Sequence, residues 1–187
     1  KGRAYWTKVY RLPEGTRNGK GRPIVNFVGL VEGEKVQAIV PVRKFGGYFC
    51  LVFATKKGII NKMDLTLFSR PRKAGVNAIS LDEGDELVKV QLVGMSEEEF
   101  KASQNAGEID DNAPETEAAD APEVEGDDAD DLEARPIPKD LLMLATRNGQ
   151  AVTFPISCFR AMGRGTHGVK GITLAEGDEV ISLLWLK

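Results

Sequence analysis

Hydrophobic residues in this chain of 187 residues fall into short runs that glycines, prolines and charged residues interrupt. The longest run, YFCLVFA at 48–54, is far too short to cross a bilayer. After an acidic turn at 32–35, apolar residues at Val36, Ala38 and Val40 alternate in part with other residues, in the period of a half-buried strand. Twenty glycines and nine prolines spread through such runs favour many turns and short strands. The pattern predicts an all-β fold.

Two of the apolar runs reveal an internal repeat. FATKKG at 53–58 and LATRNG at 144–149 each end in a basic turn closed by glycine, after which an apolar run resumes. Asn148-Gly149 is a strong signal for a two-residue β-hairpin loop. The opening Lys1-Gly2 matches the end of the same turn, with its first strand missing. We therefore expect the chain to be part of a longer protein.

A basic, glycine-containing loop follows each turn at a near-constant distance, and an acidic turn follows each loop. The loops are TRNGKGRPIV, RPRKAGVNAI and GRGTHGVKGI, and the acidic turns are EGEK at 32–35 and EGDE at 83–86 and 176–179. Units of about 50 residues with about four short strands each have the size of a propeller blade. The sequence predicts two blades over 1–95, the first of them truncated, an acidic insertion over 96–136, and a further blade over 137–187.

The net charge of −3 conceals two oppositely charged parts. The tract at 96–136 holds 16 acidic residues against Lys101 and Arg135, whereas the rest of the chain has 23 basic and 12 acidic residues. Because the tract has few aromatic or branched residues, we predict that it is disordered, although SEEEFKA is compatible with a helical turn. It is either a solvated linker or an internal mimic of DNA charge that weakens DNA binding.

Enzyme chemistry has little support in these residues. The phosphate-loop pattern GxxxxGK[ST] is absent, and the single histidine, His167, has no partners in a recognisable catalytic arrangement. Cys50 and Cys158 are expected to be buried free thiols of a cytosolic protein. The acidic turns are interpreted as turn formers and not as calcium ligands. We predict no catalytic residue and no metal ligand.

The basic residues of the loops and turns are the candidates for binding. Equivalent positions on successive blades share a rim, so their charges should form a curved band that suits a bent phosphate backbone, with glycines exposing peptide N–H groups to it. Nothing resembles a base-reading element, so sequence specificity should be low. A solvated rim without function is the alternative. The predicted DNA-binding residues are Arg17, Lys20, Arg22, Lys56, Lys57, Arg70, Arg72, Lys73, Arg147, Arg164, His167 and Lys170.

Outside the acidic tract, the chain closely resembles blades of the C-terminal domain of the DNA gyrase A protein. The resemblance rests on residues 2–42, FATKKGIINKMDLTLFSRPRKAGVNAISLDEGDEL and LATRNGQAVTFPISCFRAMGRGTHGVKGITLAEGDEVISL. It implies a β-pinwheel, a ring of usually six blades that exchange strands, whose basic rim wraps double-stranded DNA. It also implies an ATP-dependent bacterial type II topoisomerase that introduces negative supercoils, located in the cytoplasm at the nucleoid.

The resemblance assigns no catalysis to this chain. ATP and Mg²⁺ are expected on the gyrase B protein and on the cleavage core, within an A2B2 heterotetramer and without a membrane partner. The family's Gln-Arg-Arg-Gly-Gly-Lys-Gly box is absent, and Tyr5, Tyr10 and Tyr48 occupy blade positions. Two alternatives remain. One is the C-terminal domain of the topoisomerase IV A protein, against which GKGRPIVN followed by EGEK argues, and the other is a protein-binding propeller scaffold without a DNA role.

Overall fold

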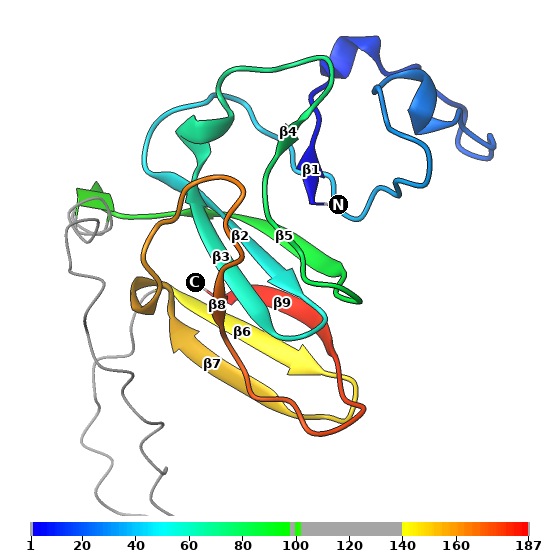
Figure 1. Ribbon diagram of the computed structural model, residues 1–187. Coiled ribbons are helices and arrows are strands. Elements are labelled where there is room, and N and C mark those ends of the chain that lie inside the picture. The colour runs from blue at the N-terminus through cyan, green and yellow to red at the C-terminus, as the bar shows by residue number, and fades with distance from the viewer. Residues whose placement is uncertain (1, 98–99, 102–139, 187) are drawn as a thin grey trace, which may run out of the picture.

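The structure is a computed structural model that describes residues 2–97, 100–101 and 140–186 (Figure 1). We refer to 2–45, 48–94 and 140–186 as the first, second and third repeats. Most of the acidic tract predicted to be disordered lies outside the described residues. At its start, the Phe100 N–H donates to the Ser96 carbonyl (3.0 Å) and Lys101 pairs with Glu97 (2.8 Å), which is the expected helical turn.

The described residues form three antiparallel sheets, and short 3₁₀ helices lie in the segments between some of their strands. Their strand orders are β1-β4, β5-β2-β3-β8 and β7-β6-β9. The strands are β1 (Arg3–Ala4), β2 (Phe49–Thr55), β3 (Ile59–Asp64), β4 (Val76–Asn77), β5 (Leu87–Gly94), β6 (Leu141–Thr146), β7 (Ala151–Pro155), β8 (Val169–Lys170) and β9 (Val180–Leu186). The 3₁₀ helices are η1 (Val9–Arg11), η2 (Ile24–Asn26), η3 (Leu65–Phe68) and η5 (Ile156–Cys158).

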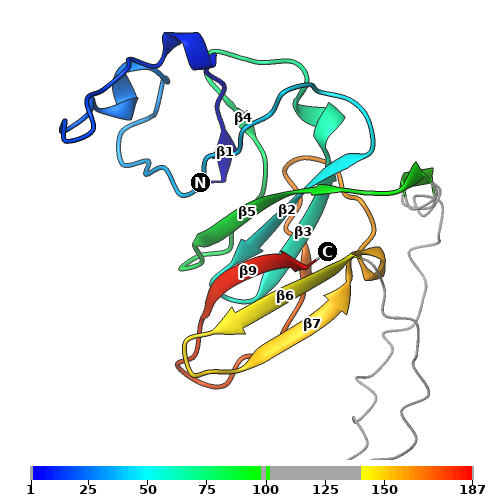
Figure 2. The same cartoon turned by 180° about the vertical axis from the view of Figure 1, so that it is seen from behind.

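The second and third repeats each give one short strand to the repeat before them. β8, from the third repeat, pairs with β3 of the second, and β4, from the second repeat, pairs with β1 of the first. Figures 1 and 2 show the sheets one after another, with β5 and β9 side by side. The predicted all-β, propeller-like class is confirmed. Among the described sheets only the second has four strands, because the fourth strand of a blade comes from the following repeat.

The second and third repeats agree down to strand register. Ala54 pairs with Lys89 and Ala145 with Ser182, and in both pairs the register shifts at the next residue of the central strand. Each shift leaves one residue of the third strand unpaired, as in a β-bulge, which bends the strand and increases its twist. The second and third repeats therefore share the same pairing of their strands, and they differ mainly in their loops.

The predicted hairpin at Asn148-Gly149 is present, but its loop is longer than expected. The Gly149 N–H donates to the Thr146 carbonyl (3.2 Å), and the Thr146 N–H donates to the Gln150 carbonyl (2.8 Å). A two-residue type I′ turn needs positive φ at both loop positions, whereas in the described chain only glycines have positive φ. The result is a three-residue loop closed by the left-handed Gly149 (φ 88°).

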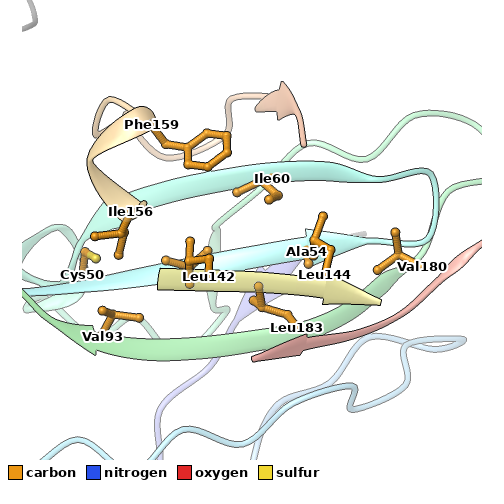
Figure 3. Packing of buried hydrophobic residues seen from close by; sticks show 11 residues of the cluster. Cys50, Ala54, Ile60, Val93, Leu142, Leu144, Ile156, Phe159, Val180 and Leu183 are labelled. Carbon is orange, nitrogen blue, oxygen red and sulfur yellow. The ribbon is translucent and has the colours of Figure 1, made fainter. Parts of the chain in front are cut away.

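The core consists of two clusters, one in each space between successive repeats. Side chains of β2 alternate between them: Cys50, Val52 and Ala54 face the third repeat, and Leu51 and Phe53 face the first. Figure 3 shows the cluster between the second and third repeats, where side chains of β2 and β5 meet those of β6 and β9. Burial on both faces explains why residues 50–54 of the YFCLVFA run are continuously apolar instead of alternating.

The first repeat departs from the prediction. Residues 36–42 form no strand, although their counterparts in the second repeat form β5. β5 pairs with β2, and the first repeat has no counterpart of β2 in this sequence. Consequently, Val9 is 83% exposed, whereas Leu65 and Ile156, at the same position of their repeats, are each 1% exposed.

Strand exchange brings two backbones very close at Gly168. This residue has a φ of +100°, and a Cβ added to it would lie 2.5 Å from the Ile60 carbonyl oxygen of the preceding repeat. Gly75 is the equivalent residue of the second repeat, where an added Cβ would lie 2.9 Å from the Ala4 carbonyl oxygen. Two of the glycines that marked the basic loops in the sequence, Gly75 and Gly168, are therefore required by the strand exchange itself.

Candidate nucleic-acid interface

The second and third basic loops each rest on the repeat that precedes them. In the third basic loop (161–170), the Met162 N–H donates to the Lys62 carbonyl and the Gly165 N–H to the Ala78 carbonyl, both at 2.8 Å. Peptide N–H groups were expected to face phosphate, but these two are used to attach the loop to the second repeat. The loop can present its side chains to DNA, while its backbone serves in part to join the blades.

The second basic loop (70–75) is attached to the first repeat in a similar way. The Arg3 guanidinium donates to the Ala74 carbonyl, and Trp6 Nε1 donates to the Phe68 carbonyl of η3 (3.0 Å). At the next seam Lys62 Nζ donates to the Ile156 carbonyl of η5 (3.1 Å). Two different side chains at equivalent positions, Trp6 and Lys62, therefore each donate to a carbonyl in the 3₁₀ helix of the following repeat.

Most cations of the three basic loops are exposed to solvent. Within the described part of the chain, their side chains form no ion pair with a carboxylate. They are Arg17, Lys20, Arg22, Arg70, Arg72, Lys73, Arg164 and Lys170. An exposed cation without a carboxylate partner keeps its full charge for an anionic ligand, and it loses no intramolecular pair when that ligand binds.

His167 differs from its neighbours in the third loop. Its Nδ1 lies 3.0 Å from Asp82 Oδ1, in the second repeat, and its side chain is 67% exposed. The pair is an ion pair only when the imidazole is protonated. Being exposed, it contributes little to stability.

The cations of the hairpin turns are paired with carboxylates. Lys56 Nζ lies 2.8 Å from Glu86 Oε2 and 3.9 Å from Glu179 Oε2, and Arg147 forms an ion pair with the same Glu179. Hydrogen bonding to Glu86 raises the pKa of Lys56 and lowers that of Glu86. Since Glu179 belongs to the third repeat and Lys56 to the second, this network crosses the seam between them.

Lys57 is also attached to an acidic turn. Its Nζ donates to the Glu83 carbonyl (2.7 Å), and its peptide N–H donates to Asp85 Oδ1 (3.0 Å). Lys170 joins Lys56 and Lys57 in lining a shallow pocket at this seam, together with Glu86 and Asp178. Apart from Lys170, which lies near both groups, the structure thus separates the predicted residues into exposed loop cations and turn cations that lie among carboxylates. That all of them form one curved band stays a prediction.

The acidic turns also hold the hairpins in place. Asp178 Oδ1 accepts from the Glu179 N–H of its own turn (2.8 Å) and from the Asn148 N–H of the hairpin (3.0 Å). A hydrogen bond with the Thr146 side chain is the largest cause that lowers the pKa of Asp178 below its ordinary value, and hydrogen bonds from peptide N–H groups lower it further. The sequence identified the turn-forming role, but the bond to a hairpin 30 residues away could not be inferred from local spacing.

Sequence reasoning missed two buried polar side chains of β3 and misplaced one cysteine. Asn61 is fully buried and Lys62 is 2% exposed, and both contact the third repeat. The available signal was their position inside the otherwise apolar run IINKM, since buried polar groups need partners. Cys50 is buried as predicted, but Cys158 is exposed at the end of η5, where only Ile156 faces the core.

No group of three or more potential metal-ligating side chains occurs among the residues described. None of the helices in that part of the chain is long and apolar enough to span a membrane.

The sheets define a class of protein: a propeller-like all-β domain whose neighbouring blades exchange strands. A family model described as "DNA gyrase C-terminal domain, beta-propeller" matches residues 1–43, 51–93 and 140–184. The chain belongs to this family of DNA gyrase C-terminal domains, and the predicted resemblance is confirmed.

Curated relatives and solved structures agree. The chain is 82% identical to the DNA gyrase A protein of Fibrobacter succinogenes, with 100% of the chain and 22% of that protein covered. It is 36% identical to the DNA gyrase A protein of Salmonella typhimurium, with 98% and 16% covered. The chain therefore spans about a fifth of the length of these relatives.

Two solved structures share the fold. The C-terminal domain of DNA topoisomerase IV is similar with a TM-score of 0.68 and 22% identity, over 100% of this chain and 45% of that one. A DNA gyrase A C-terminal domain is similar with a TM-score of 0.65 and 20% identity, over the same shares.

Proposed function

We propose that this chain binds duplex DNA, with little regard to base sequence, through the exposed cations of its three basic loops. The observation that carries the proposal is the separation of charges. Among the described residues, the loop cations have no carboxylate partner in an ion pair, whereas the turn cations Lys56 and Arg147 do. Exposed Arg and Lys side chains suit phosphate oxygens, which fix the position of a duplex without reading its sequence.

In this proposal the chain acts within a gyrase A protein, in the bacterial cytoplasm. That protein joins gyrase B in an A2B2 enzyme that introduces negative supercoils into DNA. Bending DNA around the loops would be the contribution of this chain. ATP and Mg²⁺ would be bound by gyrase B and the cleavage core. Similarity to gyrase A relatives at up to 82% identity supports this assignment over topoisomerase IV.

The test is a titration of the intact chain with duplexes of unrelated sequence at several salt concentrations. If about five phosphates are contacted, log affinity should fall with log salt at a slope near −4.5, from about −0.9 per contact. Arg72→Ala should weaken binding to all duplexes alike and reduce the slope by about 0.9. Lys56→Ala is the matched control, since that charge is already offset by Glu86, and its effect should be smaller.

Two results would contradict the proposal. A response that does not change with salt would exclude phosphate contacts as the source of affinity. A strong preference for one duplex would require a base-reading element. Absence of DNA binding by the folded chain would leave the protein-binding scaffold as the better account.

A further inference from the structure

Polar side chains of the second repeat hold the third basic loop at the two residues that follow Arg164, Gly165 and Thr166. Asn61 Nδ2 donates to Thr166 Oγ1 (2.8 Å) and to the Thr166 carbonyl (3.2 Å). Ser80 Oγ donates to the Gly165 carbonyl (2.7 Å). Thr166 Oγ1 in turn donates to the Gly163 carbonyl (2.9 Å). The backbone immediately before and after Arg164 is therefore fixed, whereas its guanidinium is exposed.

A buried asparagine is not needed at position 61 if this residue serves only to form strand β3. The equivalent residue of the third repeat is Val152, which pairs with Leu144 as Asn61 pairs with Phe53. Asn61 is fully buried, and its Oδ1 has no hydrogen-bond partner among the described residues. A buried polar atom without a partner is unfavourable, so an apolar residue would serve the strand at least as well.

The first repeat offers a second comparison. Tyr5 occupies the position equivalent to Asn61, and its hydroxyl donates to Glu34 (2.5 Å) in the acidic turn and not to a basic loop. The second basic loop, which lies at that seam, is two residues shorter than the third, because 17 residues separate Gly58 from Gly75 and 19 separate Gly149 from Gly168. Of these two seams, only the one with the longer, third basic loop has a side-chain hydrogen bond from this strand position to the loop.

We propose that Asn61 and Ser80 are positioning residues, which hold the third basic loop in the shape that directs Arg164 toward DNA. This inference rests on the proposed function and adds that the preceding repeat determines the contact. A loop fixed before binding loses less conformational entropy when its arginine engages a phosphate. Without these side chains the same charge would be present on a loop that is held by its backbone hydrogen bonds and is less rigid around Arg164.

The experiment is a double-mutant cycle on the intact chain, measured as affinity for a duplex of arbitrary sequence at low salt. The variants are Asn61→Val combined with Ser80→Ala, Arg164→Ala, and all three together; Ser69→Ala, an exposed serine of the second repeat, is the control. Arg164→Ala should weaken binding roughly threefold to tenfold, as expected for one phosphate contact near 0.1 M salt. The anchor variant should weaken it by a similar factor, and the triple variant should be no weaker than Arg164→Ala alone.

Stability provides the readout that separates positioning from a structural role. Val at position 61 matches Val152, and Thr166 retains other partners, because its carbonyl also accepts from the Ser80 N–H (3.0 Å). The anchor variant should therefore unfold at nearly the temperature of the unmodified chain, with faster amide exchange at 163–168. If it does not fold, Thr166→Val, which removes the loop hydroxyl, takes its place in the cycle.

The possible outcomes distinguish the two ideas. If Arg164→Ala weakens binding and the anchor variant does not, the positioning role is wrong and the proposed function stands. Losses that multiply in the triple variant would also overturn the inference, since the anchors would then act independently of Arg164. If the unmodified chain does not bind DNA, the proposed function fails, and the inference fails with it.

Discussion

At the scale of single residues, surroundings decide what a charge does in this protein. Arg72 and Lys56 are both cations in regions that the sequence marked as binding sites. Arg72 has no carboxylate partner in the described part of the chain, whereas Lys56 lies between Glu86 and Glu179. Because these carboxylates are distant in sequence, their effect becomes visible only when the turns are placed in space.

Asp178 gives a pH-dependent test at this scale. Its pKa is lowered from an ordinary value of 3.8, so the ionised carboxylate stabilises the folded chain above that pH. This contribution is lost as the pH falls through the lowered pKa. Asp178→Asn should therefore be less stable than the unmodified chain at pH 7, and the difference should shrink below about pH 4.

Urea unfolding followed by circular dichroism at about pH 7, 5, 4 and 3 measures the difference. Glu176→Gln, an exposed residue of the same turn, is the control and should change stability little at any pH. A deficit of Asp178→Asn that is the same at the two ends of this range would show that its carboxylate charge is not responsible.

At the scale of elements, the hydrophobic periodicity predicted those strands whose partners lie in the same repeat. The central hairpins and the strands that follow the acidic turns of the second and third repeats could be predicted, since each has an apolar pattern ended by turn residues. The two-residue strands β4 and β8 could not, because their partners lie in another repeat and two residues carry no period. For the same reason the loop cations could be identified from the sequence, but their anchors Asn61 and Ser80 could not.

Gly168→Ala tests the exchange at this scale. Positive φ alone costs a non-glycine residue about 1 kcal/mol, and the close approach to the Ile60 carbonyl should add roughly 2 kcal/mol or more. Gly165→Ala is the matched control, with a φ of +78° and no atom within 4 Å of an added Cβ. Equal destabilisation of the two variants in urea unfolding would show that contact with β3 does not matter.

At the scale of the whole molecule, each blade is completed by its neighbours. The first repeat shows the consequence, since Val9 is 83% exposed and residues 36–42 form no strand. β7 likewise lies at an edge of its sheet, and such edges favour association with other chains. We therefore expect marginal stability or self-association of the isolated chain, which sedimentation can detect.

A graft should repair the first repeat. A copy of residues 49–56, placed before Lys1, would supply the counterpart of β2 and continue into the Lys1-Gly2 turn as Lys56 continues into Lys57-Gly58. Burying Val9 alone should contribute about 1.5 to 3 kcal/mol. The melting temperature and amide protection at 36–42 should both rise. A scrambled copy of the same composition is the control, and an equal rise with that copy would exclude specific pairing.

The pairing of β8 with the second sheet also sets an order of events on the ribosome. β3 is synthesised early, yet its outer edge is covered only when Val169 and Lys170 have been made, after roughly 75 further residues beyond Gly94. At about 5 to 20 residues per second, the nascent chain carries that open edge for roughly 4 to 15 s. The acidic tract at 96–136 supplies more than half of these residues, so its length more than doubles the time for which the edge of β3 stays open.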